Sequence, residues 1–371
     1  MPLYLTDDQA MLQETARSFM AGEGAIAKQL RHWRDKGCGD GFGHGLWKQF
    51  AELGLNGILI DEADGGLGLG HVEAGIVLEE IGRNLTPSPF LISAVAFVEA
   101  LKGTAARERW FPGIIAGETV AALAIDEGPK HRPETVEMRA ERSGNGFRLS
   151  GRKQFVVQGA SADVTLVAAQ TDEGLTLFAV ERDANGLEVE GVRLADASNG
   201  ARLTFEDVQV DADAVIGEVG GGAEILDRAL NAGRAGAAAE LVGVGSASMG
   251  MTVDYLKQRK QFGKLIGEFQ ALQFRAAHLY SELEIARAAT LKAQQLLDEG
   301  SPDAEAMVSV AKAKAGRTSQ LAVQEGVQMH GGIGMTDEYD IGLYMKRDRV
   351  LNELFGDANY HADKLARMQG Y

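Results

Sequence analysis

Two short segments in the last third of the chain hold residues suited to binding a ligand. One contains an arginine and a phenylalanine, and the other contains a pair of glycines. Arg259 is followed by Phe262, and Gly331 and Gly332 form a pair further along the chain. A guanidinium offers a planar fork of N–H donors that fits a diphosphate, and glycine lets a ligand approach the backbone closely. These residue types suit the diphosphate of a dinucleotide. The structural alternatives are a salt bridge of Arg259 on a helix face and a helix C-cap at Gly331.

Other residues with chemical potential favour structural interpretations. His330 precedes the glycine pair and is expected to be a hydrogen-bonded structural histidine. Cys38 is the single cysteine, which rules out an intramolecular disulfide and, without a Cys–His motif, indicates an inert thiol. The glycine-rich run at residues 65–70 does not fit a phosphate-binding pattern and predicts a turn. No metal site is predicted.

Composition limits the partners that the chain can have. It has 371 residues, of which 45% are hydrophobic and 24% charged, and a formal net charge of -16. These proportions are ordinary for a globular protein, and the length predicts two or three domains. The negative field would repel nucleic acid and anionic membranes, so any anionic ligand needs a local cluster of lysine and arginine. Neither a secretory signal nor a membrane-spanning stretch is visible, and the cytoplasm is the expected location.

Three zones of different texture predict an α+β fold made of three domains. A helical N-terminal domain is expected over residues 1–117, opening with Thr6 as N-cap and Gln9 completing a capping box. Residues 118–216 contain short β-rich runs separated by turn signals, which predicts an antiparallel barrel or sandwich. Residues 217–371 are helical again and predict a bundle of the four-helix type. Its helices are expected at about 223–260, 268–298, 302–329 and 338–353.

The two segments that open this section also carry a family resemblance. The segment that starts at Arg259 resembles R-x-x-F-G-x-x-I-x-x-F-Q of the acyl-CoA dehydrogenase family, and residues 328–338 resemble its Q-x-x-G-G-x-G-x-x-x-E. The order helical, β, helical agrees, so the resemblance covers nearly the whole chain. It implies that family's fold, with FAD held at a subunit interface. The residues that it assigns to a partner subunit's FAD are Arg259, Gln261, Phe262, Ile266, Gln270, Gln328, Gly331 and Gly332.

The resemblance also implies a reaction, the α,β-dehydrogenation of an acyl-CoA thioester. In this family a carboxylate takes the α-proton and flavin N5 takes the β-hydride. The two positions that carry the base in relatives are occupied here by Gly356 and Gly233, which have no side chain. Asp357 is one residue late and is the remaining candidate for the base. Arg234 and Phe355 are the implied substrate-site residues.

The β domain departs from the family as well. The family's W-I-T segment, whose Thr hydroxyl faces flavin N5, reads Phe155-Val156-Val157 here. Phe155 and Val157 are therefore expected at the flavin, without that hydroxyl. The family's T-E-P-x-x-G-S-D loop is represented by residues 125–132, which have a different sequence. The residues that would hold a neighbour's FAD match the family. The residues that would act in this chain's own site, the base and the Thr at the flavin, are replaced.

This asymmetry resembles the small subunits of heteromeric acyl-CoA dehydrogenases, of the pimeloyl-CoA dehydrogenase small subunit type. The implied substrate is a bulky or dicarboxylic acyl-CoA. The implied partners are a second acyl-CoA dehydrogenase chain, in a dimer or dimer of dimers, and electron-transferring flavoprotein as acceptor. Two alternatives stay open. The chain is a self-sufficient homo-oligomer that uses Asp357 as base, or a non-catalytic binding or scaffold member of the fold.

Overall fold

The computed structural model describes residues 3–371, which divide into two compact units. The first, which we call the helical unit, comprises residues 3–28, 71–86 and 234–371. The second, which we call the sheet unit, comprises residues 29–70 and 87–233. Residues 3–117 thus contribute to both units.

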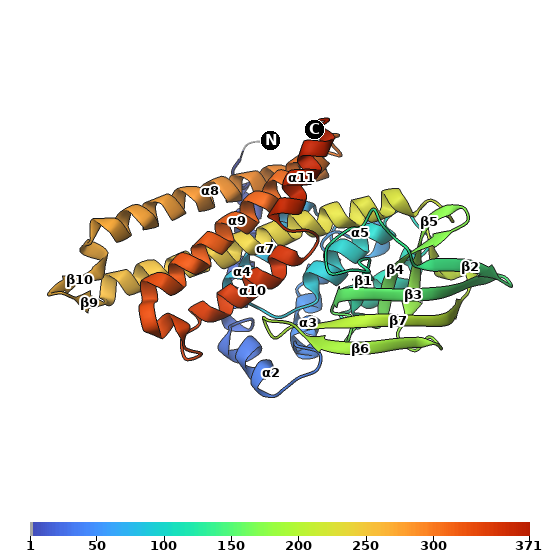
Figure 1. Ribbon diagram of the computed structural model, residues 1–371, viewed down its shortest axis with the longest axis horizontal. Coiled ribbons are helices and arrows are strands. Elements are labelled where there is room, and N and C mark those ends of the chain that lie inside the picture. Colours follow the sequence, from blue (N-terminus) through green and yellow to red (C-terminus); the bar gives the residue numbers. More distant parts are fainter. Residues whose placement is uncertain (1–2) are drawn as a thin grey trace. The chain divides into compact units, whose positions relative to one another are not determined.

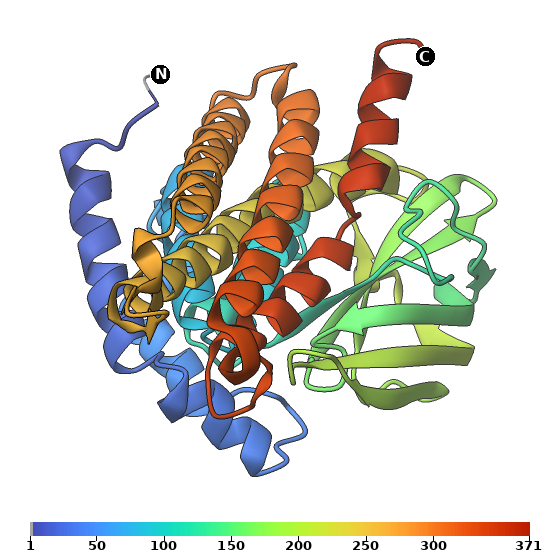
Figure 2. The same cartoon turned by 60° about the vertical axis from the view of Figure 1, so that its left-hand side comes forward.

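The helical unit is made of long helices that bury one face. α8 and α9 run side by side, and Leu279 and Leu283 of α8 form a buried cluster with Ala322 of α9 (Figures 1 and 2). α1 begins after Thr6, and both hydrogen bonds of the predicted capping box with Gln9 are present. The predicted C-terminal helices are confirmed, with ends that shift by about three residues at most. The helices are α1 (Asp7–Gly22), α4 (His71–Asn84), most of α7 (Gly222–Gln258), α8 (Gln270–Asp298), α9 (Ala304–His330), α10 (Ile341–Glu353) and α11 (Ala358–Met368).

Glycines allow α4 and α7 to pack backbone against backbone. A Cβ atom at Gly82 of α4 would lie 2.2 Å from the carbonyl oxygen of Glu240. A Cβ atom at Gly243 of α7 would lie 2.0 Å from the carbonyl oxygen of Glu79. Such contacts are too short for any side chain, so the small residues of this part of α7 serve close helix packing.

The sheet unit is built on one mixed sheet. The strands follow the order β6-β7-β3-β2-β4-β5-β8, with β1 beside β4. The sheet is mainly antiparallel, as predicted, and its two parallel pairs are β1 with β4 and the short contact of β2 with β4. The long connection from β1 to β4 lets the chain return in the same direction, which a hairpin cannot do. The strands are β1 (Ala121–Ala124), β2 (Arg139–Ser143), β3 (Gly146–Val157), β4 (Val164–Thr171), β5 (Gly174–Glu181), β6 (Leu187–Arg193), β7 (Asn199–Val210) and β8 (Val215–Ile216).

Short helices complete the sheet unit. They are α2 (His32–Asp35), α3 (His44–Glu52), α5 (Val98–Leu101) and α6 (Arg107–Ile115), and a π-helix over Leu91–Phe97 leads into α5. The glycine run at residues 65–70 is a turn, as predicted, because Gly65 has a φ of 89° and Gly66 packs against Ile60. Within residues 3–371, no helix is both long enough and apolar enough to span a bilayer.

Candidate functional site

A tight hairpin in the helical unit presents Phe262 to the outside. Strand β9 (Lys260–Gln261) pairs antiparallel with β10 (Lys264–Leu265). The two residues between them, Phe262 and Gly263, have φ values of 53° and 80°. Positive φ at both positions is typical of the type I′ turn, whose twist suits a two-residue hairpin. The phenyl ring of Phe262 is 91% exposed, which is unusual for a large apolar side chain and predicts a ligand or partner there.

Arg259 stands just before this hairpin with an uncommitted side chain. Its backbone is fixed, because its N–H donates to the Tyr255 carbonyl at 2.9 Å and its carbonyl accepts from Ile266 N at 2.8 Å. Its guanidinium is exposed and makes no hydrogen bond or ion pair with any residue between 3 and 371. The salt bridge that would explain Arg259 structurally is therefore not seen in this part of the chain. A rigid backbone with a free guanidinium is suited to an anionic ligand.

The glycine pair lies at the C-terminal end of α9 with its backbone open. Gly331 is the C-cap residue, with a φ of 65°, and its N–H donates to the Gln328 carbonyl. A Cβ atom at Gly331 or Gly332 would meet nothing within 4 Å, so packing within the chain does not require glycine at either position. The positive φ accounts for Gly331 alone. The open backbone of both residues is what a closely approaching ligand needs.

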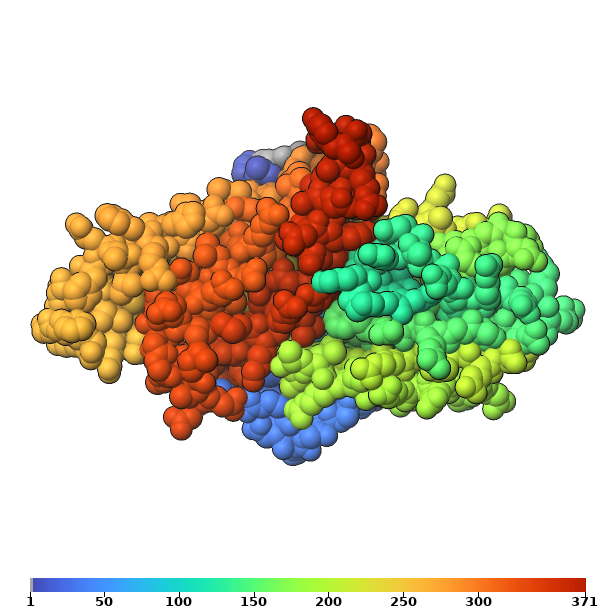
Figure 3. Space-filling view, viewed as in Figure 1, coloured from blue at the N-terminus to red at the C-terminus, as the bar shows by residue number. Residues whose placement is uncertain are grey.

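Contacts among three rings bring the hairpin and the glycine pair to the same end of the bundle. The ring of His330 lies 4.5 Å from that of Tyr255 on α7 and 4.8 Å from that of Tyr339. Both turns accordingly appear at one end of the long helices, on the molecular surface (Figures 1 and 3). His330 is buried, its Nδ1 donates to the Gly326 carbonyl at 2.7 Å, and burial lowers its pKa. This is the structural histidine expected from the sequence.

The remaining residues assigned to this end of the bundle also face outward. Gln261, Gln270 and Gln328 are exposed, and Ile266 is half-buried. We call the set Arg259, Gln261, Phe262, Ile266, Gln270, Gln328, Gly331 and Gly332 the clamp residues.

A bulge in the sheet unit redirects the segment expected at the flavin. The pairing of β3 with β7 shifts register between Lys153 and Val156, and Phe155 inside this bulge has a φ of 51°. Bulges are frequent next to functional sites because they re-aim side chains. Phe155 is half-buried and Val157 is buried.

Lys153, which the sequence did not single out, organises the loop that follows β1. Its side chain is fully buried, and its Nζ donates to the Ile125 carbonyl at 3.0 Å and to Glu127 Oε1 at 2.6 Å. Glu127 in turn accepts the N–H groups of Glu137 and Met138. Burial lowers the pKa of the Lys153 ammonium, against the opposing effect of Glu127. The loop that replaces the family's usual sequence is therefore fixed by its own buried ion pair.

Three buried side chains hold the loop that contains the two residues Phe355 and Gly356. Arg234 Nε donates to the Phe355 carbonyl at 3.2 Å, and His361 Nε2 lies 3.2 Å from the same oxygen, to which it donates. Lys312 Nζ donates to the Gly356 carbonyl at 2.9 Å. Phe355 and Gly356 both have positive φ, of 61° and 102°. The loop is thus kept in an uncommon conformation by donors from three helices.

Lys312 is the centre of this arrangement and was missed by sequence reasoning. Its side chain is completely buried, and burial together with the nearby Arg234 lowers its pKa to about 7. The buried Asp348 has its pKa raised by burial to about 6, and Asn352 Nδ2 donates to its Oδ1 at 3.0 Å. The available signal was a lysine at an otherwise apolar helix position.

Asp357 has a structural task. Its Oδ1 accepts the N–H groups of Asn359 at 3.0 Å and Tyr360 at 2.8 Å, which makes Asp357 the N-cap of α11. A second carboxylate that the sequence offered, Glu240, is also engaged, since Arg347 Nε donates to its Oε1 at 2.8 Å. Neither carboxylate stands free as a base.

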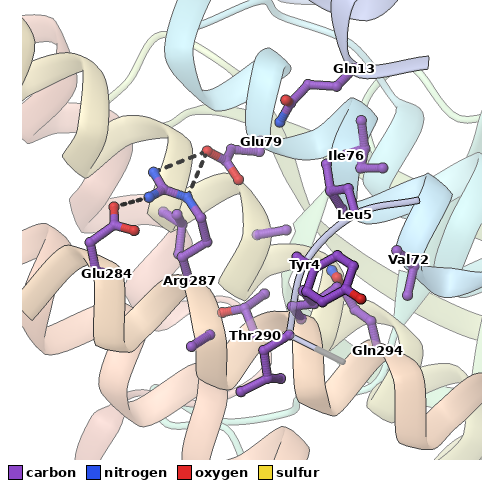
Figure 4. Close-up of a pocket in the computed structure, with 16 residues that line it drawn as sticks. Tyr4, Leu5, Gln13, Val72, Ile76, Glu79, Glu284, Arg287, Thr290 and Gln294 are labelled. Carbon is purple, nitrogen blue, oxygen red and sulfur yellow. Dashed lines mark hydrogen bonds and ion pairs between the residues drawn. The ribbon is translucent and has the colours of Figure 1, made fainter. Parts of the chain in front are cut away.

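A separate cavity of about 180 Å³ lies in the helical unit, and none of the predicted site residues lines it (Figure 4). Val72, Ile76 and Leu291 contribute apolar walls. The guanidinium of Arg287 donates to Glu79 at 3.3 Å and to Glu284. Two carboxylates offset this cation, so the cavity lacks the free positive charge that a diphosphate requires.

Comparison with known proteins shows which family the chain belongs to. Residues 6–118, 127–208 and 220–369 match the N-terminal, middle and C-terminal domains of acyl-CoA dehydrogenases. The chain belongs to the acyl-CoA dehydrogenase family. It is 33% identical to mitochondrial isovaleryl-CoA dehydrogenase of Arabidopsis thaliana, over 83% of this chain and 78% of that protein.

Solved structures agree over the whole chain. Butyryl-CoA dehydrogenase from Megasphaera elsdenii superposes with a TM-score of 0.89 at 26% identity and covers 100% of both chains. A chain of the Tcur3481-Tcur3483 steroid ACAD superposes with a TM-score of 0.89 at 29% identity and covers 98% of both chains. The predicted three-domain acyl-CoA dehydrogenase fold is confirmed.

As a member of this family, the chain is an FAD-dependent oxidoreductase. The clamp fits the diphosphate of that cofactor, because it offers a free guanidinium and bare glycine backbone beside an exposed ring. Bound FAD supplies the hydride acceptor.

Proposed function

We propose that this acyl-CoA dehydrogenase chain is the cofactor-holding subunit of a heteromeric enzyme that dehydrogenates an acyl-CoA thioester between its α and β carbons. The observation that carries the proposal is the contrast between two parts of the helical unit. Among the clamp residues, the guanidinium of Arg259 is exposed, and the backbone of Gly331 and Gly332 is open to a ligand. Gly356, at the expected base position, has no side chain, and the neighbouring Asp357 caps α11.

Cofactor binding, substrate binding and proton abstraction are assigned to different residues in this proposal. Arg259, Gly331 and Gly332 bind the diphosphate of the partner subunit's FAD, and Phe262 covers an apolar part of that cofactor. Arg234 and Phe355 stay assigned to the substrate side, where they shape the wall of the acyl site through the loop that Arg234 fixes. Phe155 and Val157 lie along the flavin. The carboxylate that takes the α-proton belongs to the partner chain, because general base catalysis needs a placed group that this chain does not supply.

The substrate in this proposal is a bulky acyl-CoA, and electron-transferring flavoprotein is the acceptor. The steroid ACAD among the structural relatives supports a bulky acyl group. The name of that relative joins two designations, Tcur3481 and Tcur3483, which also favours an assembly of two different family members.

The decisive experiment is an assay of the purified chain alone and with a family member that carries Glu at the base position. An artificial electron acceptor and a panel of acyl-CoA esters report turnover, and the flavin spectrum reports cofactor. We expect negligible turnover alone and restoration by the partner chain. Brisk turnover of the chain alone would contradict the proposal.

The second candidate is a homo-oligomer that uses Asp357 as base, since Asp357 is the carboxylate adjacent to Gly356. In that case Asp357→Asn abolishes turnover by the isolated chain. A colourless chain that binds no acyl-CoA and activates no partner would instead indicate a scaffold member of the fold.

A further inference from the structure

The segment 355–361 contains Gly356, at the base position that lacks a side chain, and the first four residues of α11. We infer that Tyr360 closes this chain's own proton-abstraction position by filling the space that a side chain at residue 356 would need. The assignment of residue 356 rests on the proposed function. The contacts that close the position do not, and they can be tested separately.

The closure is visible in the surroundings of Gly356. A Cβ atom built on Gly356 would lie 2.4 Å from Cδ1 of Tyr360 and 3.0 Å from its Cε1. Carbon atoms in van der Waals contact stay at about 3.5–4.0 Å, so even alanine collides with this ring. Gly356 also has a φ of 102°, a conformation that other residues rarely adopt. The glycine is thus required by the ring and by the backbone together.

The ring of Tyr360 is held in place from two sides. The guanidinium of Arg234 lies 5.5 Å from the ring centroid, in cation–π range, and its Nη2 donates to Tyr360 Oη at 3.2 Å. Arg234 is fully buried and cannot follow the ring outward without losing its bond to the Phe355 carbonyl. On the backbone side, Asp357 Oδ1 accepts the Tyr360 N–H at 2.8 Å.

These contacts give Asp357, Tyr360 and His361 tasks other than proton transfer. Asp357 sets the direction in which α11 starts, and this direction places the ring of Tyr360 over Gly356. His361 bonds the Phe355 carbonyl. Tyr360 is therefore a positioning residue, and the side chain of a glutamate placed at position 356 has room only when the ring of Tyr360 is removed.

A double-substitution cycle tests this closure without relying on activity. We would measure the melting temperature of Gly356→Ala with Tyr360 present and with Tyr360→Ala. The expected fall is at least twofold larger when the ring is present. Tyr360→Phe keeps the ring and should keep the large fall. Gly300→Ala is the matched control, because Gly300 has a φ of 61° and nothing within 4 Å of its would-be Cβ. Its effect should be the same in both backgrounds.

Equal falls for Gly356→Ala in the two backgrounds would overturn the inference. The proposed function is read out separately, by turnover of an acyl-CoA by flavin-loaded chains carrying Gly356→Glu with and without Tyr360→Ala. Turnover confined to the double variant supports both ideas. A stability cycle that shows the coupling, with no turnover in the double variant, supports the closure and counts against the proposed function.

Discussion

Lys312 is completely buried, yet within residues 3–371 no carboxylate lies within hydrogen-bonding distance of its amine. Its Nζ donates to the carbonyls of Asn352 and Gly356 at 3.2 and 2.9 Å. A buried ammonium is costly unless its protons are used, and carbonyl acceptors offset only part of the cost. The result is a pKa lowered to about 7. The amine remains a hydrogen-bond donor after it loses a proton, so the loop stays anchored in both states.

This gives a pH prediction for Lys312→Met. The unfolded lysine keeps its proton up to about pH 10, whereas the folded one loses it near pH 7. Between these values the unfolded state binds more protons, so wild-type stability rises with pH relative to the variant. The slope of the difference in unfolding free energy is up to about 1.4 kcal/mol per pH unit. Denaturant titrations from pH 6 to 10 measure it, and parallel pH profiles would refute the buried titration.

A second residue-scale prediction concerns Arg259→Ala. The free guanidinium makes charge-assisted bonds to a diphosphate, and their loss is expected to weaken FAD binding by roughly 10- to 100-fold. Lys257→Ala is the control, because Lys257 is also exposed, carries the same charge and lies outside the clamp. Flavin per chain is measured after gel filtration at matched folded content. Full flavin occupancy in Arg259→Ala would remove Arg259 from the clamp.

At the scale of the element, α11 depends on its cap. Asp357→Ala leaves the N–H groups of Asn359 and Tyr360 without their acceptor and is expected to cost about 1 kcal/mol of stability. Asp357→Asn keeps an oxygen acceptor and is expected to cost only a few tenths of that. Asp303→Ala is the matched control, since Asp303 is the N-cap residue of α9 and makes no side-chain cap bond.

Urea unfolding compares the three variants. A cost for Asp303→Ala as large as that for Asp357→Ala would show that the cap bonds contribute nothing specific. The prediction also matters for the activity assay, because Asp357→Asn must fold normally before its turnover can be interpreted.

The periodicity of apolar residues predicts some elements of the fold and does not predict others. The apolar spacing located α7 to α10 to within a turn, because long helices repeat their buried face many times. The π-helix at Leu91–Phe97 has a wider turn than an α-helix, so the spacing of apolar residues in an ordinary helix does not predict it. The bulge at Phe155 is not predicted by the alternation of apolar and polar residues either. A bulge adds one residue to a strand, and that residue needs no distinctive type.

The candidate site divides in the same way. The clamp residues fall in two short segments, 259–270 and 328–332, and carry distinctive types, so a motif predicts each segment. The anchoring of the loop at Gly356 joins Arg234, Lys312 and His361 from three helices far apart in the chain. Such contacts depend on how the helices pack, and no local pattern encodes them.

At the scale of the molecule, the exposed apolar residues of α8 call for a partner. Phe274 and Ile285 are 68% and 54% exposed, and they lie about three turns apart on the same face of the helix. Phe262, at the hairpin that leads into α8, is 91% exposed. A chain with a net charge of -16 has ample polar surface, so this apolar face is a feature that a monomer would not need.

The last prediction is that the double variant Phe274→Asp, Ile285→Asp loses its oligomeric state and its flavin together. Apolar contact across α8 would be replaced by buried like charges, and the clamp would lose the subunit that carries the rest of the FAD site. Light scattering gives the mass, and absorbance in the same run gives the flavin per chain. Leu53→Asp is the control, because Leu53 is 44% exposed and belongs to the sheet unit. It should change neither quantity. A monomeric double variant that keeps its full flavin would show that one chain holds the cofactor alone, and the interface clamp would then be wrong.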